Sequence, residues 1–260
     1  MQKNLTLYLF LPLSANILLV GLYFSGNEFS QHLVSPIIDG LPFRSWREFG
    51  LLEQLQNLFI LGIIVLFVRA AFQKDSQLEK VFFSTGAVVF LFLFLEEIDY
   101  GLHFYSYLTG NGSETSNYNW HNLKSLGKRQ NGTYLKKISD LAMIIWFILF
   151  PLLNQKVSFP PALKAIIPSS WFILVLIIAA GTSNLAHYLD GLEWDIINGV
   201  QGSLFGNTSE FRETNTYYIC LLYAIQLTGV NLFPASDTSK SAHGQDALPP
   251  AENPAVGSGE

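Results

Sequence analysis

Residues 81–95 read VFFSTGAVVFLFLFL, and two adjacent acids, Glu96 and Glu97, follow this uncharged run directly. With the apolar residues that continue to about residue 106, the run is long enough for a helix that crosses a bilayer, which needs roughly 20 mainly apolar residues. A carboxylate at membrane depth costs roughly 2.5–3.5 kcal/mol on insertion scales, so it usually faces a protein interior or a wet cavity. The stretch therefore predicts a membrane-spanning helix with a polar site at its end.

The composition extends this prediction to the whole chain. Of its 260 residues, 50% are hydrophobic and only 13% are charged, whereas a soluble domain carries about 25% charged residues. The net charge of −5 argues against a nucleic-acid partner, which needs clustered Lys and Arg. The single cysteine, Cys220, excludes an intrachain disulfide and a zinc site built from several thiolates.

Six hydrophobic segments are each long enough to span a membrane. They lie at about residues 5–24, 50–72, 81–106, 139–155, 165–188 and 212–233. The first is longer than the 7–15-residue core that is typical of a cleaved signal peptide, so we interpret it as a retained span. Residues 234–260, rich in Ser, Pro, Ala, Gly and acids, predict a disordered tail. The predicted fold class is all-α, an integral membrane bundle of about six transmembrane helices within residues 1–233.

The charged residues are distributed unequally between the two sides of such a bundle. Six spans place both termini on one side of the membrane and the 1–2, 3–4 and 5–6 loops on the other. That second side holds most of the acids and four of the five histidines, His32, His103, His121 and His187. The asymmetry predicts one shared polar site near that interface. The short 2–3 and 4–5 connections are basic, which favours cytoplasmic termini.

Three Asn-x-Ser/Thr sequons, at Asn111, Asn131 and Asn207, lie on the same side as the acids. They would suit a luminal or extracellular surface in a eukaryote, where such sequons accept glycans. Chance occurrence in Asn- and Ser-rich loops is the alternative explanation.

Acidic, imidazole and amide side chains recur at the ends of several spans. The predicted catalytic residues are Glu96, Glu97, His121 and Glu213, the predicted metal ligands are Glu96, His103, His121 and His187, and the supporting residues are Glu53, Asn122, Asp190 and Glu210. Glu96 and His103 are seven residues apart, so they share a face if the helix persists between them. Mixed carboxylate and imidazole ligands suit zinc, iron or manganese, and such a metal could activate water. Without a metal, clustered carboxylates suit general acid or base catalysis.

The same residues also have structural explanations. Glu210 and Glu213 open a span, and acids in the first turn of a helix interact favourably with its dipole. His103 and His187 could be interfacial residues near span ends. Glu96 and Glu97 could be neutralised by basic residues of the neighbouring loops in a structural ion pair. The sequence leaves both interpretations open.

Several catalytic motifs are absent from the sequence. It contains no H-E-x-x-H, no dense histidine boxes, no G-x-S-x-G, no Walker loop and no dinucleotide-binding fingerprint. These absences exclude a zincin-type protease and argue against a desaturase-like di-iron enzyme.

Short motifs resemble a group of uncharacterised bacterial multi-pass membrane proteins. In that group a span ends in E-E-I-S-W-G-Q and the next loop contains N-L-H-N, and here residues 96–101 read EEIDYG and residues 119–122 read NWHN. The acidic starts of two other spans fit the same group, at Glu48, Glu53, Glu210 and Glu213. Asp99 and Tyr100 depart from the pattern. The resemblance covers roughly residues 45–225 and implies a bacterial inner-membrane protein, but the group brings no established activity.

A fainter similarity links the chain to CAAX-type intramembrane proteases. These also use a Glu-Glu pair on one helix with histidines on later helices. They have an arginine four residues after the second glutamate, where this chain has Gly101. That departure argues against protease activity.

The function predicted from these patterns is that of a membrane enzyme with a carboxylate and histidine site at one interface. It would be a metal-dependent hydrolase that acts on a lipid or membrane-bound substrate. The alternative is non-enzymatic, a transporter or a membrane-complex assembly subunit whose carboxylates bind an ion or a partner helix. Ion-coupled transport usually places acids near the midplane and shows repeated halves, and the sequence shows neither.

Overall fold

Long apolar helices account for most of the chain that the computed structural model describes. The described residues are 2–34, 36, 49–109, 137–138, 140–191, 194–197, 200–202, 204 and 207–230. They all belong to one unit, Met1–Val230. The predicted tail, residues 234–260, lies outside the described residues.

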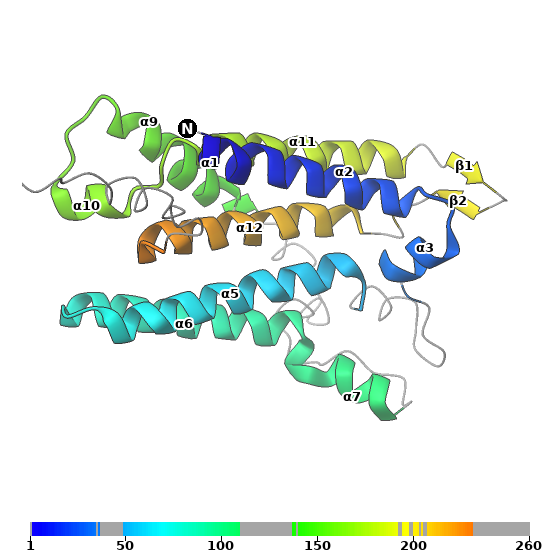
Figure 1. Ribbon diagram of the computed structural model, residues 1–260, viewed down its shortest axis with the longest axis horizontal. Helices are drawn as coiled ribbons and strands as arrows, with labels where there is room; N and C mark the ends of the chain where they lie inside the picture. The colour runs from blue at the N-terminus through cyan, green and yellow to red at the C-terminus, as the bar shows by residue number, and fades with distance from the viewer. Residues whose placement is uncertain are drawn as a thin grey trace, which may run out of the picture. The chain divides into compact units, whose positions relative to one another are not determined.

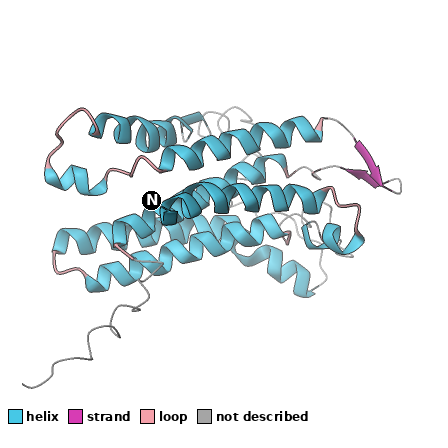
Figure 2. Cartoon of the chain, turned by 45° about the horizontal axis from the view of Figure 1, so that its top comes forward, coloured by secondary structure: helices cyan, strands magenta, loops and turns pink. Residues whose placement is uncertain are grey.

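Figure 1 shows the helices and the two short strands in their order along the chain. The first half contains α1 (Gln2–Leu5), a π-helical turn η1 (Thr6–Phe10), α2 (Leu11–Tyr23), α3 (Glu28–Val34), α5 (Leu51–Gln73), α6 (Gln77–Glu97), a 3-10 turn η2 (Asp99–Gly101) and α7 (Leu102–Thr109). The second half contains a π-helical turn η4 (Ile145–Leu149), α9 (Phe150–Asn154), α10 (Pro161–Ile166), α11 (Phe172–Asp190), β1 (Trp194–Ile197), β2 (Val200–Gly202) and α12 (Thr208–Thr228). The strands β1 and β2 pair antiparallel as a small hairpin (Figure 2). This hairpin is the one departure from the all-α prediction within the described ranges.

Within the described residues, four helices are long and apolar enough to cross a membrane, namely Gln2–Tyr23, Leu51–Gln73, Gln77–Glu97 and Phe172–Asp190. They correspond to four of the six predicted spans. Their outward faces carry large apolar side chains that no other part of the described chain covers. Ile17, Val65, Val88 and Ile177 are each between 61% and 65% exposed. Apolar surface of this extent is typical of a protein whose surroundings are lipid.

The two other predicted spans differ from these four. The helix Asp140–Asn154 is apolar but shorter. Helix α12 is 21 residues long, but it carries too many polar residues to meet the same criterion. It packs against α5 and α11, and none of its residues from Thr208 to Thr228 is exposed. Its buried polar side chains, Glu210, Thr214 and Asn215, therefore lie in the interior of the bundle.

Two prolines explain the π-helical turns. Pro12 and Pro151 each lie two residues after such a turn, η1 and η4 respectively. A proline inside a helix lacks an N–H and its ring clashes with the carbonyl four residues earlier. A wider turn, in which the residue before the proline bonds five residues back, relieves the clash without ending the helix. Leu11 accordingly donates to the carbonyl of Thr6, and Phe150 donates to that of Ile145.

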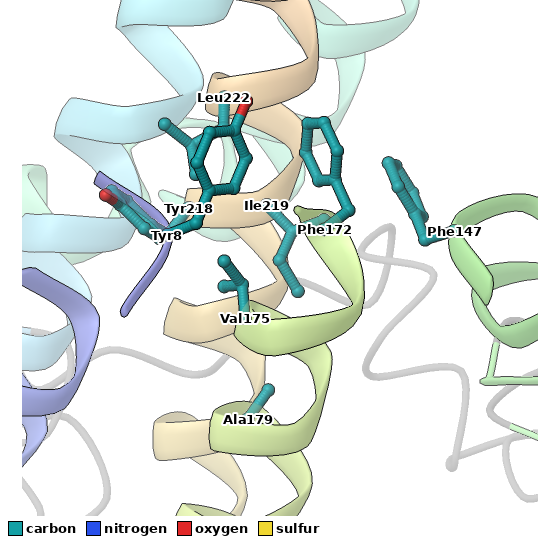
Figure 3. Packing of buried hydrophobic residues seen from close by; sticks show 8 residues of the cluster. All are labelled: Tyr8, Phe147, Phe172, Val175, Ala179, Tyr218, Ile219 and Leu222. Carbon is teal, nitrogen blue, oxygen red and sulfur yellow. The ribbon is translucent and has the colours of Figure 1, made fainter. Parts of the chain in front are cut away.

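Aromatic packing joins the two π-helical turns to the centre of the bundle. The cluster in Figure 3 contains Tyr8, Phe147, Phe172, Val175, Ala179, Tyr218, Ile219 and Leu222. The ring of Phe172 on α11 lies 5.1 Å from that of Tyr8 and 5.1 Å from that of Phe147, measured between centroids. Rings at this separation add roughly 0.5–1.5 kcal/mol per pair beyond the burial of their surface. The cluster therefore fixes α11 and α12 against both proline-containing helices.

Candidate functional site

The predicted acids that the structure describes lie on helices that end or begin at one end of the bundle. Helices α2, α6 and α11 end there, and α5 and α12 begin there (Figure 1). A buried apolar cluster beneath this end contains Tyr23, Leu52, Ala186 and Phe211, one from each of α2, α5, α11 and α12. The ends of these helices are therefore held together by packing, and the acids near them share one region.

Glu210, in the first turn of α12, is buried at 4% exposure and bonded on both carboxylate oxygens. Gln56 on α5 donates from Nε2 to its Oε2 at 3.2 Å, and Ser209 donates to its Oε1 at 3.1 Å. The same Nε2 of Gln56 donates to Oγ1 of Thr214 at 3.2 Å. This group links α5 to α12, and the helix dipole further stabilises the carboxylate. For Glu210 the observed contacts agree with the structural interpretation.

A second link joins α6 to α12 through a phenol. Tyr217 donates a hydrogen bond from its hydroxyl to Oε1 of Glu97. Glu213, one helical turn before Tyr217, lies close enough to interact electrostatically with the same phenol. Glu213 is also 4.0 Å from Arg212, whose guanidinium lies 3.5 Å from Asp140. Of the predicted catalytic residues, Glu97 therefore bonds Tyr217 directly, and Glu213 lies within electrostatic range of it.

Glu96 is buried at 8% exposure and accepts a hydrogen bond from the hydroxyl of Tyr100. This bond raises the pKa of the Tyr100 phenol, which therefore remains a protonated donor. Between the two residues the chain turns sharply. Asp99, Tyr100 and Gly101 all have positive φ, at 47°, 54° and 84°. The left-handed conformation costs non-glycine residues roughly 1–2 kcal/mol each, so the surrounding contacts hold a strained turn in the EEIDYG motif.

This turn corrects one expectation. The predicted span at residues 81–106 would have placed Glu96 and His103 on one helical face. Helix α6 ends at Glu97, and α7 starts at Leu102 after the turn. The seven-residue spacing therefore does not align the two side chains, because the helix does not persist between them.

A buried amide pair connects α2 to α12. Asn16 donates to Oδ1 of Asn215 at 2.9 Å, and Asn215 donates back to Oδ1 of Asn16 at 3.0 Å. Each amide also donates to a backbone carbonyl of its own helix, Asn16 to Pro12 at 2.7 Å and Asn215 to Phe211 at 2.6 Å. Both side chains are thus satisfied in the interior.

The other predicted site residues lie apart from these links or outside the described chain. His187 is exposed on α11, with Nδ1 2.8 Å from the carbonyl of Ser183, and Asp190 at the end of α11 is partly exposed. Glu53 is buried on α5. The side chain of His103 and all of His121 and Asn122 lie outside the described residues. Among the side chains that are described, no three from His, Cys, Asp and Glu are grouped as metal ligands would be.

The asparagine of one sequon, Asn207, has a structural role in the fold. Asn207 precedes α12, is buried at 1% exposure, and donates from Nδ2 to the carbonyl of Leu204 at 2.9 Å. Its amide is therefore not accessible to a glycan in the folded protein. Asn111 and Asn131 lie outside the described residues.

Several residues of this end were not predicted from the sequence. The most important are Gln56, Tyr100, Thr214, Asn215 and Tyr217. Spacing gives a signal for two of them. Tyr217 lies one turn after Glu213, and Gln56 lies one turn after Glu53, so each shares a helical face with a predicted acid.

The chain was also compared with known proteins. It matches no protein-family model, and no curated protein or solved structure is significantly similar to it. The resemblances to the bacterial membrane group and to the CAAX-type proteases therefore stay predictions.

Proposed function

We propose that the chain is a six-helix integral membrane protein with an acid–base site near one membrane interface. Four helices meet the length and hydropathy of membrane spans. The apolar helix Asp140–Asn154 and helix α12, none of whose residues is fully exposed, would complete the bundle. A bacterial inner membrane with cytoplasmic termini is the location that the sequence motifs and basic connections favour.

The proposed site rests on one phenol, Tyr217, that bonds one carboxylate and lies in the electrostatic field of a second. Tyr217 donates to Glu97 and lies near Glu213. A phenol that bonds one carboxylate and reaches a second during the reaction could pass a proton between them, and positioned proton transfer is the basis of general acid–base catalysis. Because these groups lie at the ends of helices with lipid-facing surfaces, a lipid or membrane-bound substrate is the class that fits. Hydrolysis is the reaction that we infer.

A divalent metal in this site remains a proposal that the described residues do not support by themselves. Its ligands would include Glu96 and the imidazoles of His103 and His121. Metal content of the detergent-purified protein, measured by plasma mass spectrometry, tests it. Stoichiometric zinc, iron or manganese that Glu96→Gln and His121→Ala both lose would support the metal. A well-folded protein without metal would refute the metal proposal, and acid–base chemistry without a metal would then be the remaining mechanism.

A second candidate function is that of an assembly subunit without catalytic activity. The observation that favours it is that Glu97 and Glu210 already accept hydrogen bonds from neighbouring helices. Carboxylates used in this way stabilise the bundle, and the exposed apolar faces would then also serve partner helices.

One experiment separates the two functions. The full chain and its Tyr217→Phe and Glu213→Gln variants are reconstituted in vesicles of phosphatidylethanolamine and phosphatidylglycerol, and lipid products are followed by mass spectrometry. Melting temperature is measured on the same samples. An acid–base enzyme predicts product formation that both variants lose by at least about 100-fold while they remain folded. Absence of product from every sample, with lower melting temperatures for the variants, would favour the assembly subunit.

A further inference from the structure

Two buried amide oxygens on α5 have no hydrogen-bond partner. Oε1 of Gln56 and Oδ1 of Asn57 are both inaccessible to solvent and accept no bond from the described chain. The Gln56 side chain is completely buried. The amides of Asn16 and Asn215, by contrast, each both donate and accept. The two unsatisfied oxygens are therefore an exception among the buried amides of this end.

The orientation of Gln56 is determined by its neighbours on α12. Its Nε2 lies between two acceptors, the carboxylate of Glu210 and the hydroxyl of Thr214, each at 3.2 Å. Exchanging nitrogen and oxygen would put Oε1 against the Glu210 carboxylate and lose both bonds. The oxygen is therefore held in a fixed position beside the α5–α12 contact. An unsatisfied buried acceptor destabilises a protein, and more so in lipid, where water cannot compensate.

We propose that these oxygens bind a dehydrated alkali cation between α5 and α12. Gln56, Asn57 and Glu210 would contribute oxygen ligands, and Glu53 lies on the same face of α5, three residues before Gln56 and four before Asn57. Oxygen is the donor that hard cations prefer, whereas zinc prefers nitrogen and sulfur. Glu53 has an interaction of its own and is not counted as a ligand. Glu210 is then the one carboxylate beside two neutral amide oxygens, and its single negative charge suits Na⁺ rather than Ca²⁺ or Mg²⁺. This site is distinct from the Glu97, Glu213 and Tyr217 group, and it does not depend on any catalytic activity.

The experiment measures the melting temperature of the detergent-purified full chain with Na⁺ as the probe. NaCl replaces choline chloride at constant total chloride, so ionic strength does not change, and a parallel series uses KCl. Binding to the folded state alone raises the melting temperature in a saturable way, by roughly 3–6 °C at a tenfold excess of cation over its dissociation constant.

Asn57→Leu is the decisive variant, because the Asn57 oxygen has no partner and the leucine is close to it in size. We expect this variant to melt at a temperature that no longer depends on Na⁺ or K⁺. Gln56→Met should lose the dependence too, but it also removes the bonds to Glu210 and Thr214 and is therefore the secondary variant. Asn184→Leu is the matched control, since Asn184 is exposed on α11 and bonds only its own helix, and it should keep the full response.

Two results would overturn the proposal. A wild-type melting temperature that is the same in NaCl, KCl and choline chloride would mean that the oxygens hold a water molecule or nothing. A cation response that persists unchanged in Asn57→Leu would mean that the cation binds elsewhere. Neither result bears on lipid turnover, so the two proposals succeed or fail separately.

Discussion

The hydroxyl of Tyr218 on α12 donates a 2.7 Å hydrogen bond to the backbone carbonyl of Leu7 in the π-helical turn of the first helix. This carbonyl has lost both of its helical donors. Leu11 bonds Thr6 instead, and the next residue is Pro12, which has no N–H. The central helix thus satisfies a backbone group that a proline has released in a neighbouring helix.

Replacement of Tyr218 by Phe should therefore lower the free energy of unfolding by roughly 1–3 kcal/mol, because a buried carbonyl is left without a donor. In a Pro12→Ala background, the first helix can supply its own N–H to the Leu7 carbonyl. Tyr218→Phe should then lower the free energy of unfolding by about 1 kcal/mol less than it does in the wild type. Denaturation with sodium dodecyl sulfate in mixed micelles measures both. Tyr188→Phe, at an exposed position on α11, is the control. Equal costs in the two backgrounds would refute the role of Pro12.

For the amide pair of Asn16 and Asn215, we predict that replacing both residues destabilises the protein less than replacing one of them. Asn215→Leu leaves the Asn16 side chain buried without its partner and should destabilise the protein by roughly 1–3 kcal/mol. Asn16→Leu combined with Asn215→Leu removes both polar groups and replaces them with apolar contact between α2 and α12. Unfolding in the same mixed micelles should find the double variant more stable than either single variant. A double variant as unstable as the sum of the two would show that the pair does not act as a unit.

The close approach of α5 and α6 depends on Gly86. A Cβ atom at this position would lie 2.7 Å from the ring of Phe67. Gly86→Ala should therefore destabilise the protein by roughly 1–3 kcal/mol through overpacking. Adding Phe67→Leu to this variant should recover part of the lost stability, because it removes the ring. Gly21→Ala is the matched control, since a Cβ at Gly21 meets no atom within 4 Å. Thermal unfolding of the wild type, the two single glycine variants and the double variant tests this. A Gly86→Ala variant as stable as Gly21→Ala would contradict it.

Hydropathy predicts where the long apolar helices lie better than it predicts their ends or the bounds of α12. Residues 50–72 were predicted as a span and α5 runs from Leu51 to Gln73, because its outward face is continuously apolar. The last span was predicted at residues 212–233, whereas α12 extends from Thr208 to Thr228. Its polar first turn follows Asn207, and it ends at Gly229, whose φ of 69° closes the helix. These end signals, rather than hydropathy, determine the bounds of this partly polar helix.

The candidate site could be predicted only as far as the acids themselves. Their position at one end of the bundle follows from counting spans, and Glu96, Glu97, Glu210 and Glu213 are near that end. Their partners, Gln56, Tyr100 and Tyr217, could not be predicted, because each bond depends on a helix rotation or a turn that hydropathy does not encode. The left-handed turn after α6 is the clearest case, since the positive φ of Tyr100 contradicts the local preference of a bulky residue.

That turn gives the sharpest test of strain in the EEIDYG motif. Gly101 and Gly181 both have open space where a Cβ would be, but Gly101 has a φ of +84° and Gly181 lies inside helix α11. Gly101→Ala should therefore cost roughly 1–2 kcal/mol through backbone strain alone, whereas Gly181→Ala should stabilise the protein by up to about 1 kcal/mol through helix propensity. Denaturation of both variants under identical conditions measures the difference. If Gly101→Ala proved as stable as Gly181→Ala, the turn would have to relax at no cost, and the hydrogen bond from Tyr100 to Glu96 would not require the left-handed backbone.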